Sequence, residues 1–306
     1  MGDALALGAL LMFSCNSFVV RAATHRLDQR IGFLVALAAN VVVAGLAALV
    51  QLAVRGGFSP VVWSAVLWFV LAGLFASYLG RRGYFRSVQT MGPSRAAAVQ
   101  VINPAFAALF AWVLLREGLG RVDLASMVVI IVGLLLTNRV PRSADALAAR
   151  GPGERGRRME AIPPAILLPA VLAAVWYALG NVTRGGAVRA WPEPVLGGLI
   201  GGVAGIAVYL LFHVDMARLR ADLRQADRRG LLLWGLAGGL AIGGQIMVIG
   251  ATLYIPVAVA VAISAAVPVV VIPASVVFLR DVEQIRPATV VGALLIVGGV
   301  ATLVLR

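Results

Sequence analysis

Lysine is absent from this sequence, and cysteine and acidic residues are scarce. The single cysteine, Cys15, cannot form an intramolecular disulfide, which excludes a small disulfide-stabilised fold. Only 13% of the 306 residues are charged, whereas 61% are hydrophobic, and the mean hydropathy is +0.97. A soluble domain is about half apolar and about one quarter charged. The composition therefore excludes a soluble or disordered chain and predicts an all-α integral membrane protein.

The basic residues are all arginine. Against 13 acidic residues they give a net charge of +13, a balance that in a soluble protein would suggest a nucleic-acid partner. Here the arginines lie mainly between apolar runs, and no basic patch is interleaved with aromatic residues. We therefore expect the lipid bilayer, and no nucleic acid, as partner. The arginine- and alanine-rich usage favours a bacterial inner membrane as the location.

Ten apolar runs have lengths close to the roughly 20 residues that a membrane-spanning helix needs. The first run follows Asp3 and no basic residue, so it is predicted to be an uncleaved span rather than a signal peptide. The run from 231 to 279 is too long for one crossing, and Pro256 is predicted to separate two spans there. The predicted spans cover residues 4–20, 31–54, 61–80 (with an alternative end near 90), 94–115, 122–138, 162–182, 194–213, 230–253, 256–279 and 287–305.

The spans divide into two sets of five, predicted as repeats over residues 1–139 and 161–306. Residues 140–160 are polar and rich in arginine, proline and glycine, and form the predicted linker. Asn103-Pro104 in the first set matches Val267-Pro268 in the second, with the same spacing to an acidic residue. An odd number of spans in each repeat gives the repeats opposite orientations, so the sequence predicts ten helices as two inverted five-helix repeats.

These residues resemble a known family. The stretch from Phe13 to Arg21, the stretch from Tyr84 to Arg95 and Leu114-Leu-Arg-Glu117 are similar to patterns of EamA domains in the drug/metabolite transporter superfamily. Phe13 replaces the tryptophan that is usual in the family, and Asp281 replaces a usual glutamate in the second copy. The resemblance implies a secondary transporter that works by alternating access, with its site between the repeats.

The arginine distribution and the resemblance predict different orientations. Loops on the amino-terminal side contain six arginines and those on the opposite side seventeen, leaving out three whose depth is uncertain. The positive-inside rule then places the linker in the cytoplasm and both termini outside. The resemblance implies cytoplasmic termini instead, so the orientation stays open.

The acidic residues all fall in loops or at the ends of predicted spans. Carboxylates within a membrane usually mark proton relays or cation sites, so this distribution disfavours proton-driven export of lipophilic cations. The spans offer no cluster of acid, histidine and nucleophile, which disfavours an enzyme. The sequence has no Walker A motif, and neither a cofactor nor a metal is expected.

Polar residues on the third span are the first candidates for substrate binding. If that helix ends near Gly80, Arg82 only extends to the membrane interface. If it continues, helical spacing puts four residues on one face, where a guanidinium, a phenol and an amide suit a carboxylate or phosphate. These four are Tyr78, Arg82, Phe85 and Gln89.

Other candidates lie on the fourth, sixth and eighth spans. Gln100 and Asn103 share a helix face and are expected either to form interhelical hydrogen bonds or to contact substrate. Pro104 and Pro268 are predicted to be hinges or kinks. The remaining substrate-binding candidates are Trp176, Tyr177, Asn181 and Gln245.

The sequence thus predicts an exporter or exchanger of small polar metabolites, with amino acids or related carboxylates as the first candidates. A flippase for lipid-linked substrates is the alternative within the superfamily, and a membrane-embedded enzyme is a third hypothesis. The sequence does not distinguish a monomer from a homodimer. Two glycine series, Gly197-Gly201-Gly205 and Gly235-Gly239-Gly243, are predicted to be helix-packing surfaces.

Overall fold

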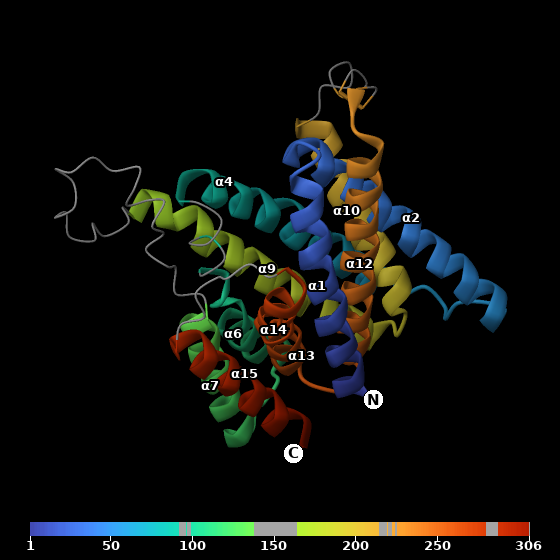
Figure 1. Cartoon of the computed structure of the whole chain (residues 1–306). Helices are drawn as coiled ribbons and strands as arrows, with labels where there is room; N and C mark the ends of the chain where they lie inside the picture. The colour runs from blue at the N-terminus through green and yellow to red at the C-terminus, as the bar shows by residue number, and fades with distance from the viewer. Residues whose placement is uncertain are drawn as a thin grey trace, which may run out of the picture.

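The computed structural model is a bundle of helices (Figure 1). It describes residues 1–91, 96, 99–137, 164–213, 219, 222–223, 225–279 and 287–305, and these residues include no strand. The helices are α1 Gly2–Thr24, α2 Gln29–Arg55, α3 Trp63–Ala72, the π-helix η1 Gly73–Gly80, α4 Arg81–Met91, α6 Asn103–Leu115, α7 Arg121–Thr137, α9 Pro164–Ala190, α10 Pro194–His213, α12 Arg228–Ala251, α13 Val257–Ser264, α14 Pro268–Leu279 and α15 Pro287–Leu305.

Eight helical segments of the described residues are long and apolar enough to cross a membrane, and α6 is a shorter apolar helix. The third predicted span continues through η1 into α4, so the longer of its two expected ends is the one observed. The count of ten crossings and their inverted arrangement remain predictions. The eight segments are Gly2–Thr24, Gln29–Arg55, Trp63–Tyr84, Leu167–Ala190, Pro194–Phe212, Arg228–Ala251, Val257–Ala274 and Ala288–Leu305.

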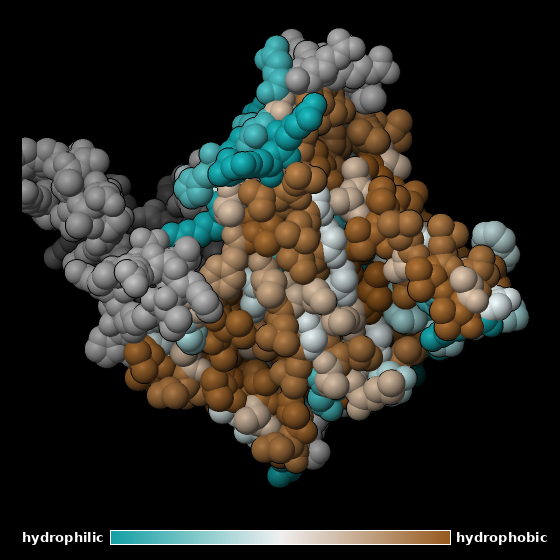
Figure 2. Space-filling view, turned by 45° about the vertical axis from the view of Figure 1, so that its right-hand side comes forward, coloured by the Kyte–Doolittle hydropathy of each residue, from teal (hydrophilic) through white to brown (hydrophobic). Residues whose placement is uncertain are grey.

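The outer surface of the bundle is apolar. Large hydrophobic side chains on four different helices are more than half exposed, among them Val50, Trp112, Leu232 and Leu294. Hydrophobic residues cover the central part of the face in Figure 2, and hydrophilic residues gather near its upper end. Such a surface is stable in contact with lipid chains and not with water.

The helix pairs that join the two halves have counterparts in which the corresponding helices of the two halves change places. Helix α1 packs against α12, and α9 packs against η1 and α4. Helix α2 packs against α12, while α10 packs against α3 and η1. The pairs α6 with α13 and α7 with α15 each join corresponding helices of the two halves. These pairings are the ones expected of a duplicated chain whose halves are related by a two-fold axis.

The fourth predicted span of each half, 94–115 and 256–279, is interrupted in the structure. Val101 and Ile102 form a turn before α6, and a break at residues 265–267 separates α13 from α14. Pro104 lies in the first turn of α6 and Pro268 begins α14. A proline is tolerated there because the first turn of a helix leaves its N–H groups without intrahelical partners. The predicted kinks are therefore breaks that precede each proline rather than bends within a helix.

Small residues allow helices to pack closely. Of the two predicted glycine series, only the one that begins at Gly197 lies at a close helix contact. A Cβ atom at Gly197 would lie 2.3 Å from Phe69, and one at Gly205 would lie 2.5 Å from Ser77. In the second series, a Cβ at Gly235 would meet nothing within 4 Å. The close approach on α12 is instead at Gly238, where a Cβ would lie 2.4 Å from the Ala36 carbonyl oxygen.

Candidate functional site

A cavity of about 460 Å³ lies between the two halves of the bundle. This volume is within the range of about 300–1,000 Å³ that is typical of small-molecule sites. Both interrupted segments border the cavity, at Gln100 and Asn103 on one side and at Ser264 and Ala265 on the other. The remaining lining residues are Phe13, Asn16, Asn40, Ala76, Ser77, Arg81, Tyr84, Tyr177, Asn181, Arg184, Gly198, Gly202, Ala241, Ile242, Gln245 and Val248.

One wall is formed by α9 together with η1 and the start of α4. Tyr177, Asn181 and Arg184 line the cavity from α9, and their spacing of four and three residues places them on one helix face. Arg184 is only 6% exposed. The predicted sixth span ended at residue 182, which put Arg184 in a loop. Helix α9 continues to Ala190, and Arg184 is therefore inside the bundle.

On the same wall, η1 and α4 present three lining residues with the same spacing of four and three positions. Ser77, Arg81 and Tyr84 line the cavity, and Arg81 follows directly after the π-helix η1. The Arg81 guanidinium carbon lies 4.7 Å from the centre of the Phe33 ring, a cation–π geometry. π-Helical segments are rare and frequently lie at functional sites.

The two arginines and Tyr177 form a connected electrostatic group. The Arg81 guanidinium interacts with the Tyr177 hydroxyl by a hydrogen bond, and both arginines interact electrostatically with Tyr177 and with each other. The Nε atoms of Arg81 and Arg184 are buried and have no hydrogen-bond partner. Within the described part of the chain, neither arginine forms an ion pair with a carboxylate, and no acidic residue lines the cavity.

The opposite wall is formed by α1 and α12 and is neutral. It contributes Phe13 and Asn16 from α1 and Gln245 and Val248 from α12. The register that aligns Pro104 with Pro268 also aligns Arg81 with Gln245, Tyr84 with Val248 and Gln100 with Ser264. The cavity is thus built from corresponding positions of the two halves, but its charge belongs to one wall.

The amides of the fourth segment hold this segment against α9. Gln100 donates a hydrogen bond from Nε2 to the Ala170 carbonyl oxygen at 3.0 Å, and Asn103 donates from Nδ2 to the Ala174 carbonyl oxygen at 3.2 Å. Both residues also line the cavity. The interhelical hydrogen bonds that were one of the two expectations for these amides are therefore present, and contact with a substrate stays a prediction.

Five of the ten predicted substrate-binding residues line the cavity, namely Gln100, Asn103, Tyr177, Asn181 and Gln245. Three others lie elsewhere. Arg82 is exposed and donates to the Tyr78 hydroxyl at 3.2 Å, so these two share a face that lies outside the cavity lining. Trp176 stacks on Phe75, with ring centres 5.6 Å apart, and does not line the cavity. The side chains of Phe85 and Gln89 are outside the described residues.

The sequence interpretation missed Arg81, Arg184, Tyr84, Asn16, Asn40 and Ser77. Helical spacing pointed to Arg184, because Tyr177 and Asn181 lie seven and three residues before it. The alignment of the repeats pointed to Arg81, because it corresponds to Gln245. Nothing in the sequence singled out Asn16 or Asn40.

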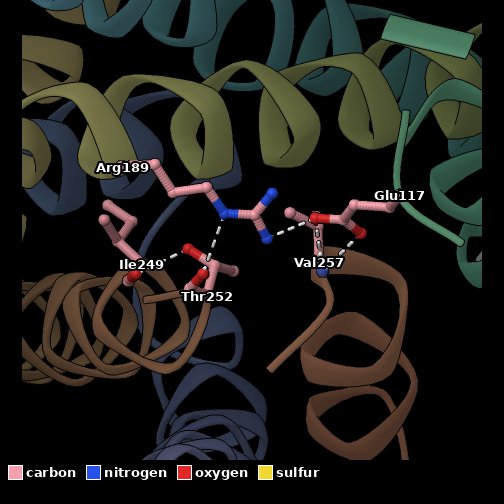
Figure 3. Close-up of polar contacts among 5 residues, drawn as sticks. All are labelled: Glu117, Arg189, Ile249, Thr252 and Val257. Atoms are coloured by element: carbon pink, nitrogen blue, oxygen red, sulfur yellow. Dashed lines mark hydrogen bonds and ion pairs between the residues drawn. The ribbon is translucent and has the colours of Figure 1, made fainter. Parts of the chain in front are cut away.

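A buried carboxylate, that of Glu117, joins the ends of four helices (Figure 3). Glu117, just after α6, accepts hydrogen bonds from the Val257 N–H at the start of α13 and forms an ion pair with Arg189 of α9. Arg189 also donates from Nε to the carbonyl oxygen of Thr252, directly after α12. A carboxylate at a helix N-terminus is favourable because it faces unpaired N–H groups and the positive end of the helix dipole.

A second buried carboxylate lies at the same end of α9. Glu193 is 2% exposed and accepts hydrogen bonds from the Ser59 N–H and hydroxyl at 3.0 Å each, and from the Gln51 amide. Arg55 lies 3.8 Å from its other oxygen. These contacts connect the end of α2 and the segment after it to the turn between α9 and α10. Two networks of polar contacts therefore join the carboxyl-terminal end of α9 to the neighbouring segments.

Among the described residues, no group of three or more histidine, cysteine, aspartate or glutamate side chains could hold a metal ion. The chemistry of the cavity is therefore that of its guanidinium, phenol, hydroxyl and amide groups. These groups bind anions and polar molecules.

Comparison with known proteins gives the family. The model of the EamA-like transporter family matches residues 1–139. These residues belong to the EamA-like transporter family. EamA domains belong to the drug/metabolite transporter superfamily, so residues 1–139 form a domain of a family of integral membrane transporters. No curated protein matches the chain.

A solved structure shares the fold of this chain over its whole length. It is described only as the crystal structure of a protein, is 19% identical and superposes with a TM-score of 0.71. The similarity covers 99% of this chain and 98% of that one. The fold is therefore common to both, and the residues of the cavity must be interpreted from this chain alone.

Proposed function

We propose that this protein is a secondary transporter that exports or exchanges small polar metabolites with an anionic group, amino acids or related carboxylates among them. It works by alternating access in a bacterial inner membrane, with the substrate in the cavity between the halves. The observation that carries this proposal is a pair of arginines on one wall of the cavity, Arg184, which is buried, and Arg81, which is partly buried.

The proposal is supported by the lack of hydrogen-bond partners at the two arginine Nε atoms. A buried charge without a partner is unfavourable, because it has lost its hydration and gained nothing in exchange. The Nε atoms of Arg81 and Arg184 have no hydrogen-bond partner. A carboxylate fits this need, since the planar guanidinium binds both carboxylate oxygens at once. Tyr177 and Asn181 offer further hydrogen bonds beside it.

The interrupted helices support alternating access. Discontinuous helices at a central site are typical of secondary transporters, because free backbone groups at the breaks face the substrate and the breaks permit movement. Both breaks border the cavity in this protein. The networks of Glu117 and Glu193 close one end, so access is expected from the other.

Counterflow in proteoliposomes tests the proposal. The full-length protein would be supplied with radiolabelled amino acids, organic acids, nucleosides and quaternary amines. We expect uptake of compounds with an anionic group and no uptake of quaternary amines. Arg184→Gln and Arg81→Gln should each reduce this uptake by about tenfold or more, because each removes a guanidinium that pairs with the anionic group of the bound substrate.

Arg82→Gln is the matched control, since Arg82 is exposed and lies outside the cavity lining. It should transport at the wild-type rate. If every soluble compound stays outside, the metabolite transporter is wrong, and movement of a lipid-linked substrate between leaflets would then be measured.

A further inference from the structure

The charge of the cavity specifies more than an anionic group. We infer that the substrate is a small dianion, a short dicarboxylate or a phosphate monoester, rather than an amino acid or a monocarboxylate. This inference rests on the proposed function of the same cavity. Its basis is that two guanidinium groups lie on one wall of the cavity and that no described carboxylate balances them.

Two of the described lining residues, Arg81 and Arg184, are cationic. The other described lining residues carry amide, hydroxyl, phenol or apolar groups. The carboxylates of Glu117 and Glu193 are engaged at the end of α9 with their own partners. The described lining of the cavity therefore presents an excess of two positive charges.

Candidate substrates differ in how much of this excess they neutralise. An amino acid brings one carboxylate and one ammonium group, so its net charge is zero and its ammonium meets no anionic partner on the described lining. A monocarboxylate leaves one guanidinium without a counter-charge. A dianion neutralises both, which removes the unfavourable burial of uncompensated charge.

The position of the arginines limits the shape of the dianion. Arg81 and Arg184 lie on neighbouring elements, since α9 packs against η1 and α4. Both line the same cavity of about 460 Å³. The inferred substrate therefore carries its negative groups close together, as on a phosphate monoester or a dicarboxylate of a few carbons. The neutral wall, with Asn16 and Gln245, then contacts the uncharged remainder.

Uptake of four small compounds of different charge, measured by counterflow in proteoliposomes, tests this inference. Succinate and glycerol phosphate represent the two kinds of dianion, and lactate and alanine represent a monoanion and a zwitterion. The assay is run at about pH 8, because a phosphate monoester with a second pKa of about 6 is then almost fully dianionic. We expect at least one dianion to be taken up about tenfold faster than lactate or alanine. The faster of the two identifies its chemistry.

Removal of one of the two charges should abolish this preference. Arg184→Gln leaves one guanidinium, so uptake of the dianion should fall more than uptake of lactate, and the ratio of dianion to lactate uptake should fall by about tenfold. Arg184→Lys keeps the charge and should retain the dianion preference in part, which separates loss of charge from loss of folding. Arg82→Gln, with its exposed guanidinium removed, should leave the ratio unchanged.

The outcomes separate the two proposals. Uptake of alanine or lactate by the wild-type protein at least as fast as of either dianion would overturn the dianion and leave the anion transporter intact. An unchanged ratio in Arg184→Gln would also overturn it. Failure of all four compounds to enter would contradict both.

Discussion

At the scale of single residues, the sequence predicts which side chains share a helix face but not which face meets the cavity. Tyr78 and Arg82 do share a face, and they contact each other. The adjacent face, with Ser77, Arg81 and Tyr84, follows the same spacing and is the one that lines the cavity. Both faces carry an arginine and a tyrosine, so composition does not distinguish them. The packing of η1 against α9 decides between them, and this packing depends on residues that are about 100 positions apart.

A buried carboxylate gives the clearest prediction about a single residue. In Glu193→Gln the amide places a donor group where Gln51, Ser59 and Arg55 all present donors to the carboxylate. We expect the stability to fall by about 2–4 kcal/mol, because a buried charged acceptor is lost and its donors remain. Thermal unfolding of the purified protein in detergent measures this change.

Asp28→Asn is the control for removal of a negative charge. Asp28 is exposed and caps α2 by accepting a hydrogen bond from the Arg30 N–H at 2.8 Å. Asparagine caps helices about as well as aspartate, so this variant should unfold within a few degrees of the wild type. Equal effects of the two substitutions would show that the Glu193 network contributes no more than a surface charge.

At the scale of helices, the predicted segments agree well with the observed ones, whereas their breaks and close contacts do not follow from hydropathy. All ten apolar runs correspond to helices among the described residues. The turn at Val101 and Ile102 lies inside an apolar run, and its residues have no turn signature. The π-helix η1 has no sequence signature either, since it is an apolar segment that continues the apolar helix α3. Such features are set by contacts between helices, and hydropathy carries no information about them.

The contact between η1 and α10 predicts a selective effect of a small substitution. A Cβ at Gly73 would lie 2.3 Å from the Gly201 carbonyl oxygen, a backbone atom that cannot move without moving α10. We expect Gly73→Ala to destabilise the protein by about 1–3 kcal/mol through overpacking. The lower unfolding temperature would be measured in detergent.

Gly235→Ala provides the comparison for this substitution. A Cβ at Gly235 meets nothing within 4 Å, and alanine favours a helix over glycine by about 1 kcal/mol. This variant should be as stable as the wild type or more so. Destabilisation of both variants to the same extent would mean that the contact between η1 and α10 is not the cause.

At the scale of the whole molecule, helices of one half pack against helices of the other, as expected of the duplication that the sequence predicts. The match of Asn103-Pro104 to Val267-Pro268 supports this prediction, because proline and polar residues stand out in apolar spans. Neither of the two arginines of the cavity was among the predicted binding residues, because the sequence pointed to Arg82 instead of Arg81 and placed Arg184 in a loop. The end of a span is poorly marked by hydropathy when a buried arginine lies within the helix.

The closed end at α9 predicts from which side the cavity is reached. A single cysteine at Ser264, which lines the cavity, would be introduced after Cys15→Ser. The linker precedes α9 and thus joins the opposite end, which the arginine distribution assigns to the cytoplasm. A membrane-impermeant thiol reagent should therefore label Ser264→Cys in inside-out vesicles and much less in right-side-out ones.

Ser126→Cys, also buried but outside the cavity lining, should label in neither orientation. Labelling of Ser264→Cys from the periplasmic side alone would contradict the assigned orientation or the closed end. Combining Ser264→Cys with Glu117→Gln should increase labelling from that side, because the ties to Val257 and Arg189 are weakened.

The two positive charges of the cavity also determine how the membrane voltage acts on transport. A cavity that holds a dianion is electrically neutral, whereas the empty cavity carries two positive charges. Moving one charge across the membrane changes the energy by about 2.3 kcal/mol per 100 mV. Exchange of one dianion for another should therefore proceed at the same rate with or without an imposed potassium diffusion potential. Net efflux, which requires the empty cavity to return, should instead accelerate or slow with the sign of that potential.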